Sequence, residues 1–367
     1  MEENITVSLI GKIENVNKCV TNQQNLEQYH ISTFDINTCD SSCIVQTDNG
    51  KIALSKWVSP KRTRSEPFAR VYKTLGELKS VTVIPVIKDE GLNGDCDHFN
   101  PITLAWMNLL NIYVILVPYV NAKKHNKKED KITAQMFDND EIKQKIEEII
   151  LFRSDAHHYN NNNFYKNFKD IYNQAVEKYK YIGKSLSINM HSLNKLEYEF
   201  KDYLEIKNKQ SLKAALREKE TNHLKEYTIY PKEIIQIKNF YEGEYFLTVD
   251  EIYFENNYLI LREAKNSTSN FPSLGEIMDA FFKCLLFLNI DELKNEQDRV
   301  IPFKVKILLT GKNVVKNNSF DKEMSKEEIE KKLKESLNFS HHKIANLAAL
   351  FYNYVQTGCT IIVGENR

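Results

Sequence analysis

Three residues of this sequence have the types and spacing that hydrolytic chemistry needs. Asp250, Glu263 and Lys265 lie in the segment EYFLTVDEIYFENNYLILREAKN and form the pattern Asp, then Glu-x-Lys. Two carboxylates can bind a hard divalent cation through oxygen, and an ammonium beside it can orient water or assist its loss of a proton. The pattern therefore indicates metal-assisted hydrolysis of a phosphate ester, provided that the three side chains meet.

A β-hairpin would bring these side chains together. The dipeptide Asn256-Asn257 separates two β-rich runs, and Asn tolerates the positive φ angles of a tight two-residue turn. When Glu255 faces Tyr258 across this turn, the register places Asp250 directly opposite Glu263. We therefore predict two antiparallel strands with the two carboxylates facing each other.

The alternation of side chains separates two groups of charges. It puts Lys265 on the face of the two carboxylates, and it puts Glu251 opposite Arg262 on the other face. Carboxylates whose Cβ atoms lie about 5 Å apart repel each other unless a cation lies between them. Oxygen ligands suit Mg²⁺ better than Zn²⁺, which prefers Cys and His, so we predict a Mg²⁺ site at Asp250 and Glu263.

The arrangement resembles the PD-(D/E)xK nuclease superfamily, which includes most type II restriction endonucleases. Asp250, Glu263 and Lys265 match its catalytic motif residue by residue, and Ala264 is the apolar spacer whose carbonyl would also reach the metal. The sequence departs from the motif at Val249, where the superfamily often has Pro. The following segments SLGEIMDAFFKCLLFLNI and FKVKILLTG fit the helix and strand of its α-β-β-β-α-β core, so the resemblance covers residues 190–310.

This resemblance implies an endodeoxyribonuclease that hydrolyses phosphodiester bonds of double-stranded DNA with Mg²⁺, with type II restriction as the leading role. Cutting both strands ordinarily needs two active sites, so a homodimer is expected, and a restriction enzyme implies a companion DNA methyltransferase. Two alternatives stay open. One is a repair, recombination or RNA nuclease of the same fold, and the other is a non-catalytic nucleic-acid-binding protein on a degenerate nuclease fold.

The regular elements around the hairpin alternate between helix and strand. Periodicity predicts a helix at 273–290, a strand at 304–309, a helix at 325–354 and a strand at 360–363. Before the hairpin, residues 138–208 show helical spacing, interrupted by the asparagine tract at 159. The fold class is therefore α/β (α+β), with a mixed β-sheet flanked by helices, and the resemblance implies a restriction-endonuclease-like core.

The first part of the chain has a different character. Apolar runs at Thr6–Ile10, Lys51–Trp57, Val81–Ile87 and Ile112–Pro118 predict an N-terminal β-rich domain, and the charged stretch from Asn121 predicts a linker or an exposed loop. We therefore expect a β-rich domain at 1–125 for DNA recognition or grip, a helical linker region at 126–190 and the nuclease domain at 191–367.

A basic segment in the N-terminal part is the candidate for binding DNA. Trp57, Phe68 and Tyr72 are interspersed with its cations, as gripping phosphates and stacking on bases would require. The alternative is an ordinary solvated face. The predicted DNA-binding residues are Lys61, Arg62, Arg64, Arg70 and Lys73.

An acidic loop, PVIKDEGLNGDCDHF, is a rival cation site because it combines carboxylates with glycine. It runs from Lys88 to Asp97, matches no EF-hand spacing and precedes a strand without Glu-x-Lys. A polar turn is the simpler interpretation of this loop, and a DNA-facing loop is a third.

Composition sets the remaining expectations. Lys plus Arg and Asp plus Glu number 50 each in 367 residues, so net charge neither supports nor excludes a nucleic-acid partner. Six scattered cysteines without a close CxxC pair favour a reduced protein, and Cys284 falls in an apolar helical pattern that predicts a buried thiol. The sequence shows neither a signal peptide nor a membrane span, so we expect a cytoplasmic protein.

Overall fold

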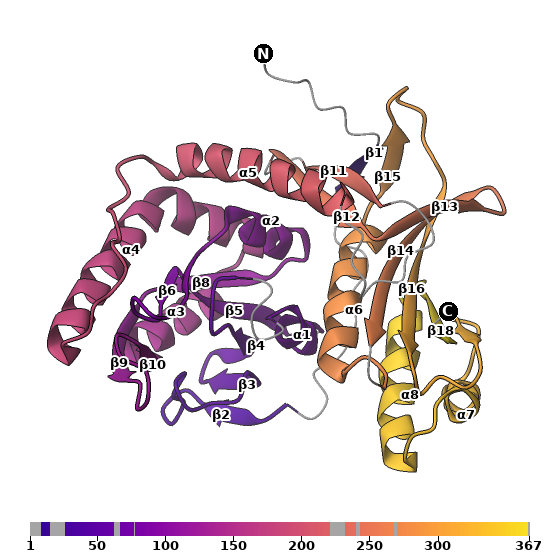
Figure 1. The fold of residues 1–367 in the computed structure, drawn as a ribbon, viewed down its shortest axis with the longest axis horizontal. Helices are drawn as coiled ribbons and strands as arrows, with labels where there is room; N and C mark the ends of the chain where they lie inside the picture. Colours follow the sequence, from indigo (N-terminus) through magenta and orange to yellow (C-terminus); the bar gives the residue numbers. More distant parts are fainter. Residues whose placement is uncertain are drawn as a thin grey trace. The chain divides into compact units, whose positions relative to one another are not determined.

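The computed structural model describes residues 9–14, 26–61, 67–76, 78–220, 232–239, 243–267 and 270–365 (Figure 1). The chain forms two compact units. Unit 1 consists of Met1–Asn22 and Lys209–Arg367, and unit 2 consists of Gln23–Asn208. Helix α5 (Phe200–Glu220) contains the border between them.

Unit 1 contains two sheets, which are joined by the candidate hairpin. The first sheet has the order β12-β11-β1-β15, with bounds β1 (Leu9–Ile13), β11 (Glu233–Asn239), β12 (Gly243–Val249) and β15 (Glu292–Asn295). The second has the order β13-β14-β16-β18-β17, with bounds β13 (Glu251–Glu255), β14 (Tyr258–Ser267), β16 (Phe303–Gly311), β17 (Asn318–Phe320) and β18 (Thr360–Glu365). Strands β14, β16 and β18 run parallel, and β13 and β17 pair antiparallel at the two edges.

The hairpin has the predicted turn and register. Asn256 and Asn257 have φ angles of 49° and 66°, and Glu251 pairs with Arg262 in the β13–β14 ladder. Since β12 ends at Val249 and β13 begins at Glu251, Asp250 lies where the chain passes from one sheet to the other. The register prediction is therefore confirmed, with Asp250 one residue beyond the last ladder pair.

The helices of unit 1 are α6 (Leu274–Leu288), α7 (Lys326–Ser336) and α8 (His341–Val355). Helix α6 begins with a capping box between Ser273 and Glu276. It corresponds to the helix predicted at 273–290, and its Cys284 is fully buried, so the predicted helix and the predicted buried thiol are both confirmed. The ring of Phe281 stacks on Tyr354 of α8 at 3.7 Å between centroids. The helix predicted at 325–354 is instead two helices, because the chain turns extended between them. The strands predicted at 304–309 and 360–363 correspond to β16 and β18.

Unit 2 contains a five-stranded sheet with the order β2-β3-β4-β5-β8 and two hairpins (Figure 1). The sheet strands are β2 (Gln28–His30), β3 (Ser42–Thr47), β4 (Gly50–Lys56), β5 (Lys79–Pro85) and β8 (Tyr113–Val117). The hairpins are β6 (Ile87–Asp89) with β7 (Cys96–His98), and β9 (Tyr119–Lys124) with β10 (Ile132–Phe137). The helices are α1 (Pro67–Lys73), α2 (Pro101–Leu109), α3 (Asn139–Leu151) and α4 (Ala156–Leu186).

The structure groups the chain differently from the boundaries at 125 and 190. The predicted strands at Lys51–Trp57, Val81–Ile87 and Ile112–Pro118 correspond to β4, β5 and β8, but these pair in parallel and are connected through helices. Helix α2 was not predicted, because all nine of its residues are buried and its sequence therefore shows no alternation of apolar and polar residues at the helical period. The stretch from Asn121 is not a linker: its first residues complete β9, and residues 125–131 form the largely exposed loop between β9 and β10. Helix α4 packs on β8 and β9, which places 126–190 with 23–125 in unit 2, whereas β1 belongs to unit 1.

The asparagine tract lies inside α4, so the prediction that it interrupts the helices was wrong. Asn160 is fully buried, accepts a hydrogen bond from the Val114 N–H at 2.8 Å and donates to the Ile112 carbonyl at 2.9 Å. The side chain thereby satisfies backbone groups of the neighbouring strand, which offsets its low helix propensity. Although α4 has 31 residues, no helix in the described part of the chain is long and apolar enough to cross a membrane.

Replacing Asn160 with Ala should destabilise unit 2. The substitution leaves a buried N–H and a buried carbonyl without partners, so the free energy of unfolding should fall by about 2 kcal/mol or more. Asn162→Ala is the matched control, because Asn162 is exposed in the same tract of the same helix. Urea unfolding followed by circular dichroism measures both variants, and equal midpoints would contradict the assigned role.

Candidate active site

Two buried carboxylates form the centre of the candidate site. Asp250 is 5% exposed and Glu263 is 1% exposed. Glu263 lies in β14, which pairs with β13 on one side and β16 on the other, so this strand is not at an edge of the sheet. The N–H of Ala264 donates to Asp250 Oδ2 at 3.0 Å, which fixes one carboxylate beside the strand that holds the other. The hairpin thus holds two acids together in a poorly solvated place.

Lys265 lies on the same face, as the alternation predicts. Its Nζ is 3.3 Å from Glu263 Oε1 and 3.7 Å from Asp279 Oδ2, the latter on α6. The side chains of Lys265 and Asp279 are each 30% exposed. The site therefore reaches solvent on the side of this ion pair.

A second lysine, which the sequence analysis missed, contacts both carboxylates. Lys283 Nζ lies 2.6 Å from Glu263 Oε2 and 3.7 Å from Asp250 Oδ1. The sequence does contain a signal for it. Asp279 and Lys283 are four residues apart in the otherwise apolar stretch IMDAFFKCLLFL, and this spacing puts two charges on one face of a helix.

The opposite face of the hairpin has its own charge compensation. Glu251 is fully buried and forms an ion pair with Arg262, as the register predicts. The guanidinium carbon of Arg262 lies 4.9 Å from the centre of the Tyr253 ring. Because this pair is complete by itself, the charges of the two faces are separate.

The candidate site carries an excess negative charge. Asp250, Glu263 and Asp279 supply three carboxylates against the two ammonium groups of Lys265 and Lys283. Burial and the charge of Asp250 raise the pKa of Glu263 to about 7. Burial acts in the same direction on Asp250, but Lys283 and the Ala264 N–H outweigh it and lower the pKa of that carboxyl. One member of the pair therefore takes up a proton near neutral pH.

The donor set fits a hard divalent cation. Glu263 Oε2 is buried and lacks a hydrogen bond with good geometry, although Lys283 Nζ lies 2.6 Å away as an ion pair. A cation between the two carboxylates would replace the proton on Glu263 and the ammonium of Lys283. The structure thus provides two oxygen ligands, with Lys283 in the position where the predicted metal would bind.

The predicted DNA-binding residues are only partly described by the structure. Arg62 and Arg64 lie outside the described residues. Lys73 is exposed, Lys61 is half exposed with Nζ 3.9 Å from Asp97, and Arg70 donates to the Lys56 carbonyl at 2.8 Å.

The aromatic residues of that segment belong to the core of unit 2. Trp57, Phe68 and Tyr72 are at most 6% exposed, and Phe68 packs against Trp57 and Trp106 at centroid distances of 6.0 and 5.3 Å. Rings buried in this way cannot stack on bases. The base-stacking part of the hypothesis is therefore wrong for these three side chains.

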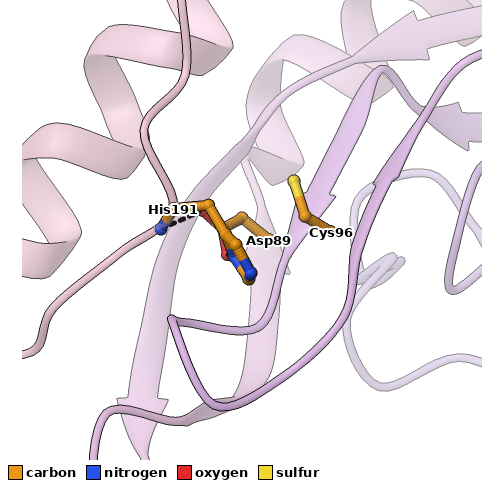
Figure 2. A group of neighbouring side chains, drawn as sticks. All are labelled: Asp89, Cys96 and His191. Carbon is orange, nitrogen blue, oxygen red and sulfur yellow. Dashed lines mark hydrogen bonds and ion pairs between the residues drawn. The ribbon is translucent and has the colours of Figure 1, made fainter.

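The acidic loop does not gather its carboxylates around one point. Glu90 forms ion pairs with Lys88 and Lys131, and Asp97 accepts a hydrogen bond from Ser59 at 2.8 Å. Asp89, in contrast, meets Cys96 and His191, and these three form the group of possible metal ligands found among the described residues (Figure 2). The loop is thus a network of ion pairs with one mixed cluster at its base.

No family model, no characterised protein and no solved structure matches this chain. The resemblance to the PD-(D/E)xK superfamily therefore stays a prediction, which depends on Asp250, Glu263 and Lys265. Their measured geometry is the basis for the proposed function.

Glu263→Gln should gain stability relative to the wild type as the pH rises. The folded protein raises the pKa of Glu263 from the ordinary 4.5 to about 7, so it binds this proton more tightly than the unfolded chain does. The stability that protonation contributes is complete below pH 4.5 and is lost as the pH rises through 7, a change of at most about 3 kcal/mol. The amide cannot ionise, so the variant lacks this loss.

Urea unfolding in EDTA at pH 5 and pH 8 measures the difference. Glu255→Gln is the matched control, because Glu255 lies in the same hairpin with an exposed side chain. If the difference in unfolding free energy between Glu263→Gln and wild type is the same at both pH values, the pKa of Glu263 is not raised in the folded protein.

Proposed function

We propose that this protein is a Mg²⁺-dependent endonuclease that hydrolyses phosphodiester bonds of double-stranded DNA. The supporting observation is the buried pair of Asp250 and Glu263, which together with Asp279 supplies three carboxylates against the ammonium groups of Lys265 and Lys283. With all five groups ionised, a divalent cation added to them would leave one net positive charge. That charge suits a phosphodiester anion.

The order of elements agrees with the core that the resemblance implies. Helix α5 is followed by β11, the nearly continuous β12 and β13, then β14, α6, the short β15 and β16. With β12 and β13 counted as one strand and β15 as an addition, this order is compatible with α-β-β-β-α-β, with Asp250 between β12 and β13 and with Glu263 and Lys265 on β14. The parallel pairing of β14 with β16 across α6 also fits. A restriction-endonuclease-like core is therefore part of the proposal.

Asp250 and Glu263 would hold the Mg²⁺, and the Ala264 carbonyl is the third ligand that the motif implies. When bound, the ion polarises the phosphate and makes a coordinated water more acidic. The chain's own contribution is to keep Asp250 ionised and fixed. The Ala264 N–H does so for Asp250 through its 3.0 Å hydrogen bond.

Lys265 acts as an ammonium and not as a base. Burial alone would lower its pKa, but the charges of Glu263 and Asp279 outweigh burial and raise it. Lys265 therefore keeps its proton at neutral pH. In this form it orients the attacking water and stabilises the charge that develops on the phosphate oxygens. Asp279 is a positioning residue, because it contacts Lys265 on the solvent side.

The biological setting belongs to the same proposal. A type II restriction endonuclease would act as a homodimer in the cytoplasm and have a companion DNA methyltransferase. Unit 2 would contribute the grip on DNA, with Lys61 and Lys73 as the exposed cations that the structure describes. Plasmid, single-stranded, branched and RNA substrates assayed side by side distinguish this role from repair or RNA cleavage.

Glu263→Ala and Lys265→Ala should each lower DNA cleavage by at least about 100-fold. The first removes a metal ligand, and the second removes the ammonium that stabilises the transition state. Purified proteins are incubated with plasmid DNA in Mg²⁺ or EDTA, and nicked and linear products are measured with time. Glu255→Gln, in the same hairpin, should cleave like the wild type. Equal cleavage by all four proteins, or cleavage in EDTA, would refute the proposed function.

Lys283→Met should tighten Mg²⁺ binding by about tenfold, because the ammonium competes with the metal for the same two carboxylates. Without metal the same variant should have a lower Tm, since two buried acids lose their nearest cation. Calorimetric titration with MgCl₂ measures the affinity. Lys306→Met is the control, because Lys306 pairs with Glu255 away from the site. Weaker Mg²⁺ binding by Lys283→Met would contradict the competition.

A further inference from the structure

A second cluster of ligand-forming side chains lies in unit 2. Asp89 and Cys96 are directly opposite in the β6–β7 hairpin, and His191 comes from the segment after α4. One ligand atom of each residue lies within 4.8 Å of the other two. Figure 2 shows the three side chains next to one another, contributed by three different segments of the unit.

The hydrogen bonds of the cluster determine which atoms can bind an ion. His191 Nδ1 lies 2.7 Å from Asp89 Oδ1, and an ionised carboxylate only accepts, so Nδ1 is the donor. A cation that binds both residues would replace this proton and lie between Nδ1 and Oδ1, because the lone pair of Nε2 points away from the carboxylate that Nδ1 contacts.

Asp89 retains capacity for a ligand bond although it is fully buried. Its Oδ1 accepts hydrogen bonds from the Gly91 N–H at 2.8 Å and from the His191 ring. Its Oδ2 accepts one longer hydrogen bond, of 3.2 Å, from the backbone N–H of His191. Each carboxylate oxygen has two lone pairs, so once the ring proton is replaced Oδ1 can bind a cation and keep its contact with the Gly91 N–H.

The set of one oxygen, one sulfur and one nitrogen selects the kind of metal. Thiolate and imidazole are the ligands that Zn²⁺ prefers, and a single carboxylate completes many zinc sites. Mg²⁺ takes only oxygen ligands and would not use Cys96 or His191. We propose that Asp89, Cys96 and His191 form a Zn²⁺ site, independent of the Mg²⁺ site proposed for unit 1.

His98 is a neighbour of the cluster and would have to move towards the ion to serve as its fourth ligand, because it is not part of the group whose ligand atoms all lie within 4.8 Å of one another. Its Nε2 lies 3.5 Å from Cys96 Sγ, and two ligands of a tetrahedral zinc, at bond lengths of 2.3 and about 2.0 Å, are separated by about 3.5 Å. The other ring nitrogen lies 3.0 Å from the Tyr172 hydroxyl, which gives His98 a partner of its own.

An open pocket borders the cluster at His191. It has a volume of about 310 Å³ and is lined by residues of the end of α4 and of the segment after it, including His191. The bound metal would connect this segment to the β6–β7 hairpin, which lies about 100 residues earlier in the chain. Its consequence is therefore stabilisation of unit 2 by linkage and not chemistry at the carboxylate pair.

Cobalt(II) is the probe of choice, because a Co²⁺–thiolate bond absorbs strongly in the near ultraviolet and tetrahedral Co²⁺ absorbs in the visible. Metal-free full-length protein titrated with CoCl₂ should show both bands, with the thiolate band saturating at one ion per chain and disappearing when ZnCl₂ is added. Cys96→Ser should abolish the thiolate band. Cys39→Ala, at another buried cysteine of unit 2, should leave the thiolate band unchanged.

A second measurement guards against a variant that does not fold. ZnCl₂ at micromolar concentration should raise the Tm of the wild type by several degrees and have no effect on His191→Gln. The absence of a thiolate band in the wild type, or a Zn²⁺ response that His191→Gln retains, would overturn the zinc site. Neither result would affect the Mg²⁺-dependent cleavage assay.

Discussion

The structure of unit 1 depends on the need to neutralise two acids that the hairpin forces together. Asp250 and Glu263 are almost completely buried, and Asp250 directly precedes the first β13–β14 pair and accepts a hydrogen bond from the Ala264 N–H, so the two acids cannot move apart without breaking this bond. Lys283 contacts both and Lys265 contacts one. An α6 that did not pack against β14 would leave the acids uncompensated, which is a far larger penalty than the loss of an exposed pair.

This compensation is incomplete, and that is what makes the site suited to a metal. Near neutral pH the two acids take up a proton because they have too few positive charges around them, and a cation could take the place of that proton. The Glu251–Arg262 ion pair on the other face has no such excess charge. Unit 2 has a cluster of different chemistry, in which sulfur and nitrogen stand beside a single carboxylate. In our proposals the ligand types direct Mg²⁺ to one unit and Zn²⁺ to the other, without any difference in overall charge.

Local sequence determined the geometry of the hairpin. The turn at Asn256-Asn257 needs positive φ angles that Asn tolerates, and the period of two along each strand then fixes which residues oppose each other. In the same way Ser273 and Glu276 define the beginning of α6 through contacts three residues apart. These features could be predicted because the interactions that decide them lie within about a dozen residues.

Only the tertiary structure decided which distant groups meet. The contact of Lys283 with the carboxylates depends on how α6 packs against β14, and the joining of His191 to Asp89 depends on the path of the chain after α4. The buried Asn160 inside α4 has the same origin, since its partners belong to a strand more than forty residues away. In each case a polar group becomes favourable only when burial brings its partner, and near neighbours in the sequence do not contain that information.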